Sequence, residues 1–175
     1  GFHDAIAREA FLFADLLKAA GAGTALFAGR AHPRAAAVSR PLAGFVPREW
    51  DAVIHHYSGA DGMLPLLQRR ETKAILRYHN ITPHHFFFGI NPDLVAGNQE
   101  GRARLPELLP LYHEVWADSQ FNLDELRALG LQGGRVLPYV SADPSAGPLT
   151  PDEERPPVIL AVGRLAPSKG LPFLL

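Results

Sequence analysis

The stretch DAVIHHYSGADGMLPLLQRRETKAILRYHN, residues 51–80, decides the fold, because it holds two apolar runs around a helical segment. The runs at residues 51–57 and 73–79 are short and rich in strand-favouring residues, which predicts two β-strands. Residues 62–70 between them predict a short helix with Pro65 in its first turn. Two strands joined through a helix indicate a βαβ unit, whose strands run parallel.

The same alternation continues on both sides of this unit. Further apolar runs that predict strands lie at residues 24–28, 114–118, 135–139 and 158–162. Helical patterns lie at residues 4–20, 104–112 and 121–129, and Ser119 is placed to cap the last of them. We therefore expect an α/β fold: a Rossmann-like parallel sheet with helices on both faces. Because a helix comes first and such units open with a strand, we also expect one strand to be missing before Gly1.

The first helix has two predicted faces. Its apolar positions, which predict the buried face, are Ile6, Ala10, Phe13, Leu16, Leu17 and Ala20. Its predicted solvent face carries Arg8, Glu9, Asp15 and Lys18. Gly21 follows as the expected stop of the helix.

The overall composition and the position of a stretch rich in Pro, Ser, Asp and Glu indicate the domain organisation. A content of 47% hydrophobic and 20% charged residues in 175 is typical of a soluble globular protein with a core. We expect residues 1–140 to form one Rossmann-like domain, residues 141–157 to form a linker rich in Pro, Ser, Asp and Glu, and residues 158–175 to begin a second domain. Residues 31–49 and 86–102 predict loops.

Charge and cysteine content exclude several classes of function. The formal net charge of −1 supports neither nucleic-acid binding nor contact with an anionic membrane. The absence of cysteine excludes disulfides and thiolate metal sites, and it fits a cytoplasmic location. His79, His84 and His85 lie close in sequence, with His55 and His56 one strand earlier, but their spacing matches no zinc pattern and the stretch lacks a well-placed carboxylate. We therefore expect no metal.

Polar side chains follow most of the predicted strands, where open parallel sheets bind ligands. These residues include His55, His56, Tyr78, His79, Asn80 and Ser119. His79 is the strongest candidate for a catalytic role, because a neutral imidazole at a strand end can bind a hydroxyl group and transfer a proton near neutral pH. The simpler interpretation is a histidine whose partners belong to the backbone of a turn.

The stretch VGRLAPSKG, residues 162–170, predicts an anion site after the last strand. Gly163 allows a ligand to approach the backbone, while Arg164 and Lys169 add two positive charges. Such charges would stabilise a diphosphate leaving group as its bond breaks. The alternative is a pair of solvated charges in a surface turn.

Five stretches resemble, in the same order, segments of the GT-B glycosyltransferases of family 4, which transfer sugars with retention of configuration. They are DAVIHHYS, YHNITP, VWADSQFNLDELRALG, VLPY and VGRLAPSKG, all within residues 51–175. The resemblance implies two facing Rossmann-like domains, of which the first binds the acceptor and the second binds a nucleotide-diphosphate sugar. It also implies an acceptor such as a glycan or a lipid-linked sugar, as in cell-envelope polysaccharide biosynthesis, and no metal or other cofactor.

The resemblance also assigns roles to residues. His79 falls on the position of a histidine at the reacting sugar, and Gly163, Arg164 and Lys169 fall on positions that hold the donor diphosphate. The acceptor-side candidates are His55, His56, Tyr78, Asn80 and Ser119. The two glutamates that the family carries eight residues apart do not occur here, so we expect the 175-residue chain alone to be inactive.

Two other functions fit the sequence. A non-catalytic, flavodoxin-like sugar-binding module would use the same strand-end histidines to recognise a ligand. A different sugar-nucleotide enzyme, such as an epimerase or a glycogen-type synthase or phosphorylase, would share the fold. The Arg164–Lys169 pair favours a sugar-nucleotide enzyme over a module that only binds.

Overall fold

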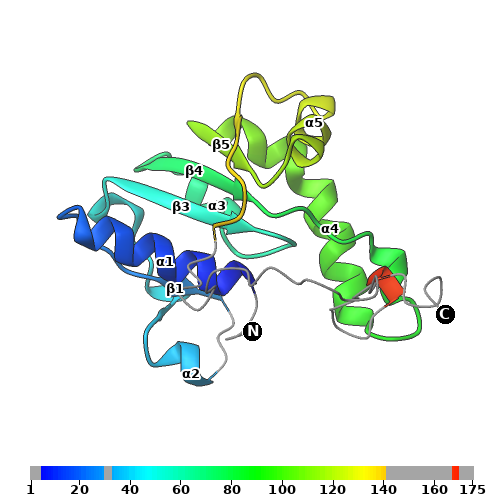
Figure 1. Cartoon of the computed structure of the whole chain (residues 1–175), viewed down its shortest axis with the longest axis horizontal. Coiled ribbons are helices and arrows are strands. Elements are labelled where there is room, and N and C mark those ends of the chain that lie inside the picture. Colours follow the sequence, from blue (N-terminus) through cyan, green and yellow to red (C-terminus); the bar gives the residue numbers. More distant parts are fainter. Residues whose placement is uncertain (1–4, 30–32, 141–166, 170–175) are drawn as a thin grey trace, which may run out of the picture. The chain divides into compact units, whose positions relative to one another are not determined.

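The computed structural model describes residues 5–29, 33–140 and 167–169 (Figure 1). The chain divides into two compact units, Gly1–Ser141 and Ala142–Leu175. In the second unit the described part is one 3₁₀ turn, η5 (Pro167–Lys169). The expected linker at residues 141–157 and the expected strand at residues 158–162 lie outside the described residues.

The main sheet of the first unit has four strands in the order β3-β4-β5-β6, and every neighbouring pair is parallel. The strands are β3 (Ala52–Tyr57), β4 (Lys73–Tyr78), β5 (Glu114–Ala117) and β6 (Arg135–Val136). Each lies within a run that predicts a strand, so the expected α/β class with a parallel sheet is confirmed. β6 is shorter than its predicted run of five residues.

In the register of the sheet, partner residues on neighbouring strands form rows, and the side chains of each row lie on one face. His56, Arg77 and Trp116 are register partners on one face, and Tyr57, Tyr78 and Ala117 are partners on the other. Because side chains alternate along a strand, His79 and Asp118, one step past the ends of β4 and β5, project to the same face as His56 and Arg77. This alternation builds the candidate site.

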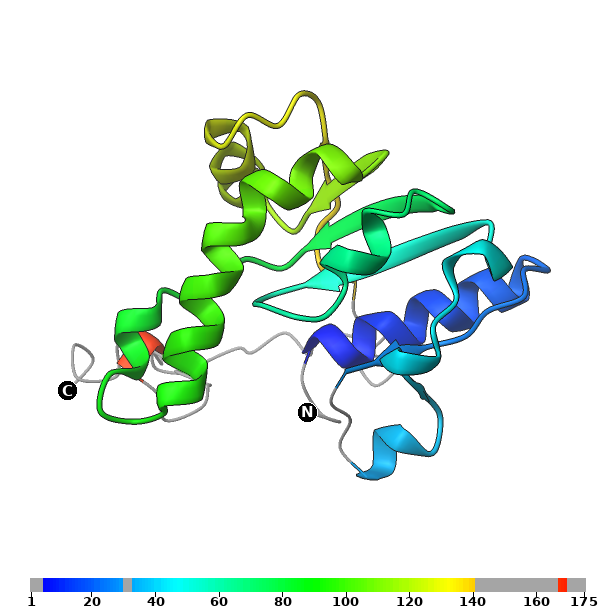
Figure 2. The ribbon, with the colours of Figure 1, turned by 180° about the vertical axis from the view of Figure 1, so that it is seen from behind.

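Helix α1 (Ala5–Ala19) covers the face that carries His56, and it runs alongside β3 in both views (Figures 1 and 2). The Phe13 ring contacts the rings of His56 and Trp116 edge-on, at centroid distances of 5.6 and 6.4 Å. Gly21, with φ +88°, ends the helix as predicted.

The predicted faces of the first helix are wrong at four positions. Glu9 is fully buried, whereas Leu16 and Leu17 are 56% and 40% exposed and Ala20 is exposed as well. The buried face is therefore rotated toward Glu9, because that carboxylate has a buried guanidinium as its partner.

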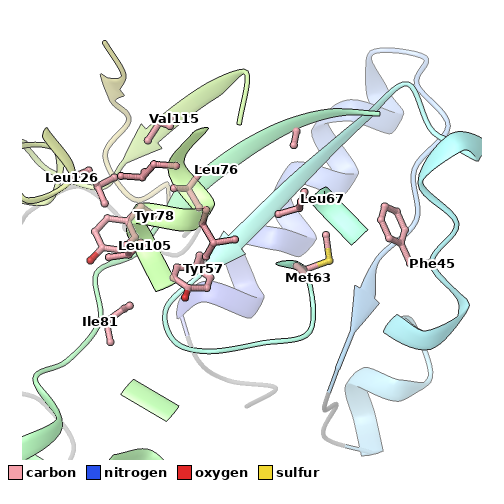
Figure 3. Packing of buried hydrophobic residues seen from close by; sticks show 13 residues of the cluster. Phe45, Tyr57, Met63, Leu67, Leu76, Tyr78, Ile81, Leu105, Val115 and Leu126 are labelled. Atoms are coloured by element: carbon pink, nitrogen blue, oxygen red, sulfur yellow. The ribbon is translucent and has the colours of Figure 1, made fainter. Parts of the chain in front are cut away.

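Three helices cover the other face and enclose the core. They are α3 (Leu64–Leu67), α4 (Pro92–Leu108) and α5 (Gln120–Ala128). Figure 3 shows the side chains of Tyr57, Leu76 and Tyr78 from the strands among Leu105 and Leu126 from α4 and α5. All five are 2% exposed or less, so these contacts provide much of the hydrophobic stabilisation.

Helix α4 corrects one prediction. It begins at Pro92, within residues predicted as a loop, and Asn91 caps it by accepting a hydrogen bond from Leu94 N–H. A 3₁₀ turn, η3 (His84–Phe87), precedes it, and another, η4 (Leu109–Leu111), follows it. Two glycines and Pro106 weaken the intrinsic helix propensity of this segment, so tertiary packing decides its conformation.

Residues 31–49 correct another prediction, because they contain short elements rather than one loop. These are α2 (Pro33–Ala36), β2 (Arg40–Pro41), η1 (Leu42–Gly44) and η2 (Pro47–Glu49). β2 pairs in parallel with β1 (Phe27–Ala28) in a separate two-stranded sheet. Within the described parts of the chain, no helix combines the length and apolar character needed to cross a membrane.

Candidate functional site

Five side chains meet on the α1 face of the sheet, near the carboxyl ends of β3, β4 and β5. We call them the histidine cluster: Glu9, His56, Arg77, His79 and Asp118. Backbone bonds extend the sheet past two strand ends, because His79 N–H donates to Tyr57 O and Asp118 N–H lies 3.3 Å from Tyr78 O. The sheet itself therefore positions two members of the cluster.

The two histidine rings lie edge to edge and nearly in one plane, with one nitrogen of each ring facing the other. Their ring centroids lie 5.1 Å apart with 14° between the planes, and His56 Nδ1 lies 2.9 Å from His79 Nε2. His79 Nδ1 lies 3.1 Å from Asp118 Oδ2. Because a carboxylate only accepts, Nδ1 of His79 carries a hydrogen. In the neutral ring Nε2 is then the acceptor, and His56 Nδ1 donates to it.

Arg77 joins the acidic members. Its Nε and Nη2 donate to the two oxygens of Glu9 at 2.9 and 2.7 Å, and its Nη1 donates to Leu137 O at 2.7 Å. Asp118 Oδ1 lies 2.7 Å from Nη2 as an ion pair without hydrogen-bond geometry. Val140 N–H donates to Glu9 Oε1 at 3.1 Å, so α1, β4 and the segment after β6 meet at this guanidinium.

Burial and charge set the protonation of this cluster. Burial is the largest cause that lowers the pKa of His56 to about 3, so His56 is neutral near pH 7. Burial raises the pKa of Glu9, but the hydrogen bonds from Arg77 and Val140 outweigh it and the net pKa is lowered. The cluster therefore combines an ionised carboxylate with a neutral imidazole.

His55, an acceptor-side candidate, lies on the opposite face of β3. It is 6% exposed, with Nδ1 2.5 Å from the Tyr112 hydroxyl and Nε2 2.5 Å from Asp61 Oδ2. Burial raises the pKa of Tyr112, so its hydroxyl keeps its proton and can donate to Nδ1. Nε2–H then donates to Asp61, and both ring nitrogens have partners inside the protein.

Tyr78 also lies on the opposite face, fully buried, and its hydroxyl donates to Glu125 at 2.7 Å. Asn80 adopts a left-handed conformation with φ +64°. Its amide nitrogen donates to Asn122 Oδ1 at 2.8 Å, and its Oδ1 accepts from Ile81 N–H. Ser119 caps α5 as predicted, by accepting from Asn122 N–H at 3.2 Å.

Of the five acceptor-side candidates, the structure therefore brings His56 into the cluster of His79. It gives the side chains of His55, Tyr78, Asn80 and Ser119 partners elsewhere in the protein. Of the donor-site candidates, Gly163 and Arg164 lie outside the described residues, and Lys169 is an exposed residue of η5 in the second unit.

Three members of the cluster were not predicted as site residues: Glu9, Arg77 and Asp118. Two signals in the sequence point to two of them. Arg77 is a charged residue inside a strand that is otherwise mostly apolar, and Asp118 follows an apolar run as His79 does. For Glu9, 68 residues before Arg77, the sequence carries no such signal.

Glu9, His56 and His79 also offer three metal-ligating atoms that lie close together. Among the described residues, this is the one group of three or more His, Cys, Asp or Glu side chains whose ligand atoms lie close enough together to hold a metal ion. Comparison with family models, with curated proteins and with solved structures finds no match for this chain, so its own geometry carries the functional argument.

Proposed function

We propose that this chain belongs to a retaining glycosyltransferase that transfers a sugar from a nucleotide-diphosphate sugar to a glycan or lipid-linked acceptor. The first unit would be the acceptor side, and residues 158–175 would begin the donor side. We further propose that the enzyme acts in the cytoplasm, in cell-envelope polysaccharide biosynthesis, and needs no metal or other cofactor. The resemblance of five segments to family 4 motivates this assignment.

One observation carries the proposal: His79 is held at the carboxyl end of a parallel strand by a carboxylate. Ligands of open parallel sheets bind beyond this edge. With its hydrogen on Nδ1, directed to Asp118, His79 has an acceptor lone pair on Nε2. That lone pair can accept a hydrogen bond from a hydroxyl of the reacting sugar.

The structure defines what substrate binding would have to change. The side chain of His79 is 3% exposed and that of His56 is 14% exposed, and Nε2 already accepts from His56. A sugar hydroxyl would therefore replace His56 as the donor to Nε2. His56 would move aside as a neutral group, because its low pKa keeps it uncharged.

The transfer step would use charges from the second unit. The bond between the anomeric carbon and the diphosphate oxygen breaks, and a bond from that carbon to the acceptor oxygen forms. The acceptor proton leaves with the nucleoside diphosphate. Arg164 and Lys169 would stabilise the negative charge that develops on the diphosphate.

The test is a transfer assay on this chain and, if its reading frame is longer, on the whole protein, with a panel of nucleotide sugars and glycan or lipid-linked acceptors, followed by mass spectrometry. We expect His79→Ala to impair transfer and to leave nucleotide affinity nearly intact. Lys169→Ala and Arg164→Ala should each lower the rate by roughly a hundredfold or more. A change below about threefold in either would remove the donor-site assignment, since such donors contribute far more.

The same assay separates the alternatives. Binding of a carbohydrate without any transfer would favour the sugar-binding module. Interconversion of the nucleotide sugar without an acceptor would favour an epimerase. A large loss of nucleotide affinity in His79→Ala would indicate that His79 acts on the donor side or has a structural role.

A further inference from the structure

We propose that Glu9, His56 and His79 form a binding site for one divalent transition-metal cation of the zinc class. This site goes beyond the proposed function, which needs no metal. The sequence argued against such a site because the histidines match no zinc spacing and have no well-placed carboxylate beside them in the chain. The fold supplies that carboxylate from α1, on the far side of the same cluster.

The separations of the ligand atoms fit a metal. His56 Nδ1 and His79 Nε2 are 2.9 Å apart, and they lie 3.8 and 3.6 Å from Glu9 Oε2. Tetrahedral zinc with bonds of about 2.0–2.2 Å to nitrogen and oxygen places its ligand atoms roughly 3.3 Å apart. The three observed separations lie on both sides of this value. Completing the geometry takes shifts of a few tenths of an ångström and a rotation of the two rings, so that both nitrogens face a common point next to Glu9 Oε2.

The partners behind these ligands also fit. Metal-bound histidines usually donate their second N–H to a carboxylate, which fixes the ring and its tautomer. His79 makes this contact to Asp118 at 3.1 Å. Glu9 is fixed by Arg77 and by Val140 N–H, and the Phe13 ring packs against His56. Each ligand is thus held before any cation arrives.

The net charge of the cluster favours the binding of a cation. Two carboxylates and one guanidinium give a formal charge of −1 when the imidazoles are neutral. Arg77 opposes the cation, but its bonds to Glu9 leave a lone pair on Oε2 that can face the metal. His56 would move its hydrogen from Nδ1 to Nε2, so no proton has to leave the site.

The ligand set indicates the kind of cation. Two imidazoles and one carboxylate suit zinc, cobalt or nickel better than magnesium or calcium, which prefer oxygen ligands. The side chain of His56 is the most exposed of the three, at 14% against 3% and 0%. A cation would therefore enter past His56.

The experiment titrates Co²⁺ and Zn²⁺ into the purified 175-residue protein, prepared without a polyhistidine tag. Calorimetry and the visible absorption of Co²⁺ report binding. We expect one equivalent with the absorption of a tetrahedral site, and its loss in His56→Gln and in His79→Gln. Asp118→Asn should weaken binding by about 10–100-fold, as the loss of a group that orients a metal ligand does.

The matched control is the double variant His84→Gln/His85→Gln, which removes an adjacent histidine pair on η3. It should bind as the wild-type chain does. Far-UV circular dichroism checks that each variant folds. If a cluster variant does not fold, imidazole NMR of the wild-type chain decides, because Zn²⁺ should shift the signals of His56 and His79 and leave those of His84 and His85 in place.

Three results would overturn the site: no saturable binding, binding unchanged in both His56→Gln and His79→Gln, or binding lost in the control variant. None of these readouts involves sugar transfer. A metal site and the proposed function can therefore fail separately. If both hold, a bound cation occupies Nε2 of His79, and Zn²⁺ should inhibit transfer.

Discussion

Arg77 shows how one residue organises this unit. Its guanidinium is fully buried, contacts two carboxylates and one carbonyl, and joins α1 to the sheet. A buried ion pair adds little stability compared with apolar residues that fit the same space, but the loss of one partner is costly. The main effect of Arg77 is therefore to balance the charges of Glu9 and Asp118, which would lack a countercharge without it.

We expect Arg77→Met to lower the free energy of unfolding by about 3–5 kcal/mol, because Glu9 would remain buried without a countercharge. Urea unfolding at pH 7 measures this change. The double variant Glu9→Leu/Arg77→Met removes both charges and should recover most of the loss. A single variant within about 1 kcal/mol of the wild type, the range of an exposed pair, would show that this ion pair is not buried in solution.

Asp61 gives a prediction about pH. Burial raises the pKa of Asp61, but hydrogen bonds from His55 and Met63 N–H outweigh it, so the folded-state pKa is lowered. A carboxyl group with a lowered pKa stabilises the fold above its unfolded pKa of about 3.9, and this contribution is lost as pH falls through the folded value.

Asp61→Asn should therefore destabilise the protein at pH 7 by about 1.5–3 kcal/mol, the usual contribution of a hydrogen bond to a charged group. The difference in the free energy of unfolding between this variant and the wild type should narrow steadily as the pH falls below the pKa of the free carboxyl group. Urea unfolding at pH 7 and at several acidic pH values compares the two. An equal difference at every pH would mean that Asp61 acts through shape rather than charge.

At the scale of elements, α4 depends on a glycine. A Cβ atom on Gly101 would lie 2.7 Å from Ala60 N and 2.8 Å from two atoms of Gly59, all of them backbone. The Tyr57 hydroxyl also donates to Gly101 O at 2.8 Å. Gly101 therefore allows α4 to approach the loop after β3 closely enough to cover the core.

Two alanine substitutions in α4 test this close approach. Gly101→Ala should destabilise the protein by about 1–3 kcal/mol or more, the usual cost of overpacking. Gly97→Ala is the matched control: its Cβ meets no atom within 4 Å, so it should stabilise the helix by about 0.5–1 kcal/mol. Thermal unfolding of both variants measures the contrast. Equal effects would show that α4 does not pack against this loop.

At the scale of the whole molecule, the sheet predicts an order of local stability. β4 is hydrogen-bonded on both sides, by β3 and β5, and its Leu76 and Tyr78 are fully buried. The two-residue strands β1 and β2 form a separate sheet with each other. Regions with few buried contacts and short ladders open at the lowest free energy.

Native-state hydrogen exchange should therefore be slowest for amides of β4 and much faster for those of β1 and β2. The measurement is amide exchange by NMR or mass spectrometry at neutral pH. Equal protection in β1 and β4 would mean that the two sheets unfold as one cooperative unit.

The strand positions and the capping of α5 could be read from the sequence. The pattern of apolar runs placed all four strands of the main sheet, and Ser119 marked the start of α5, because these signals are local. The start of α4 was missed, because Gly97, Gly101 and Pro106 each weaken the local helix signal. The packing that favours the helix joins residues far apart in the chain.

By itself the sequence determined a parallel α/β sheet with His79 at a strand end, since alternation and strand propensity act between neighbours in the chain. Tertiary structure alone decided what surrounds His79. Glu9 reaches the cluster only because α1 crosses the row of His56, Arg77 and Trp116, and Asp118 only because β5 lies in register beside β4. The burial that neutralises His56 also exists only in the folded chain.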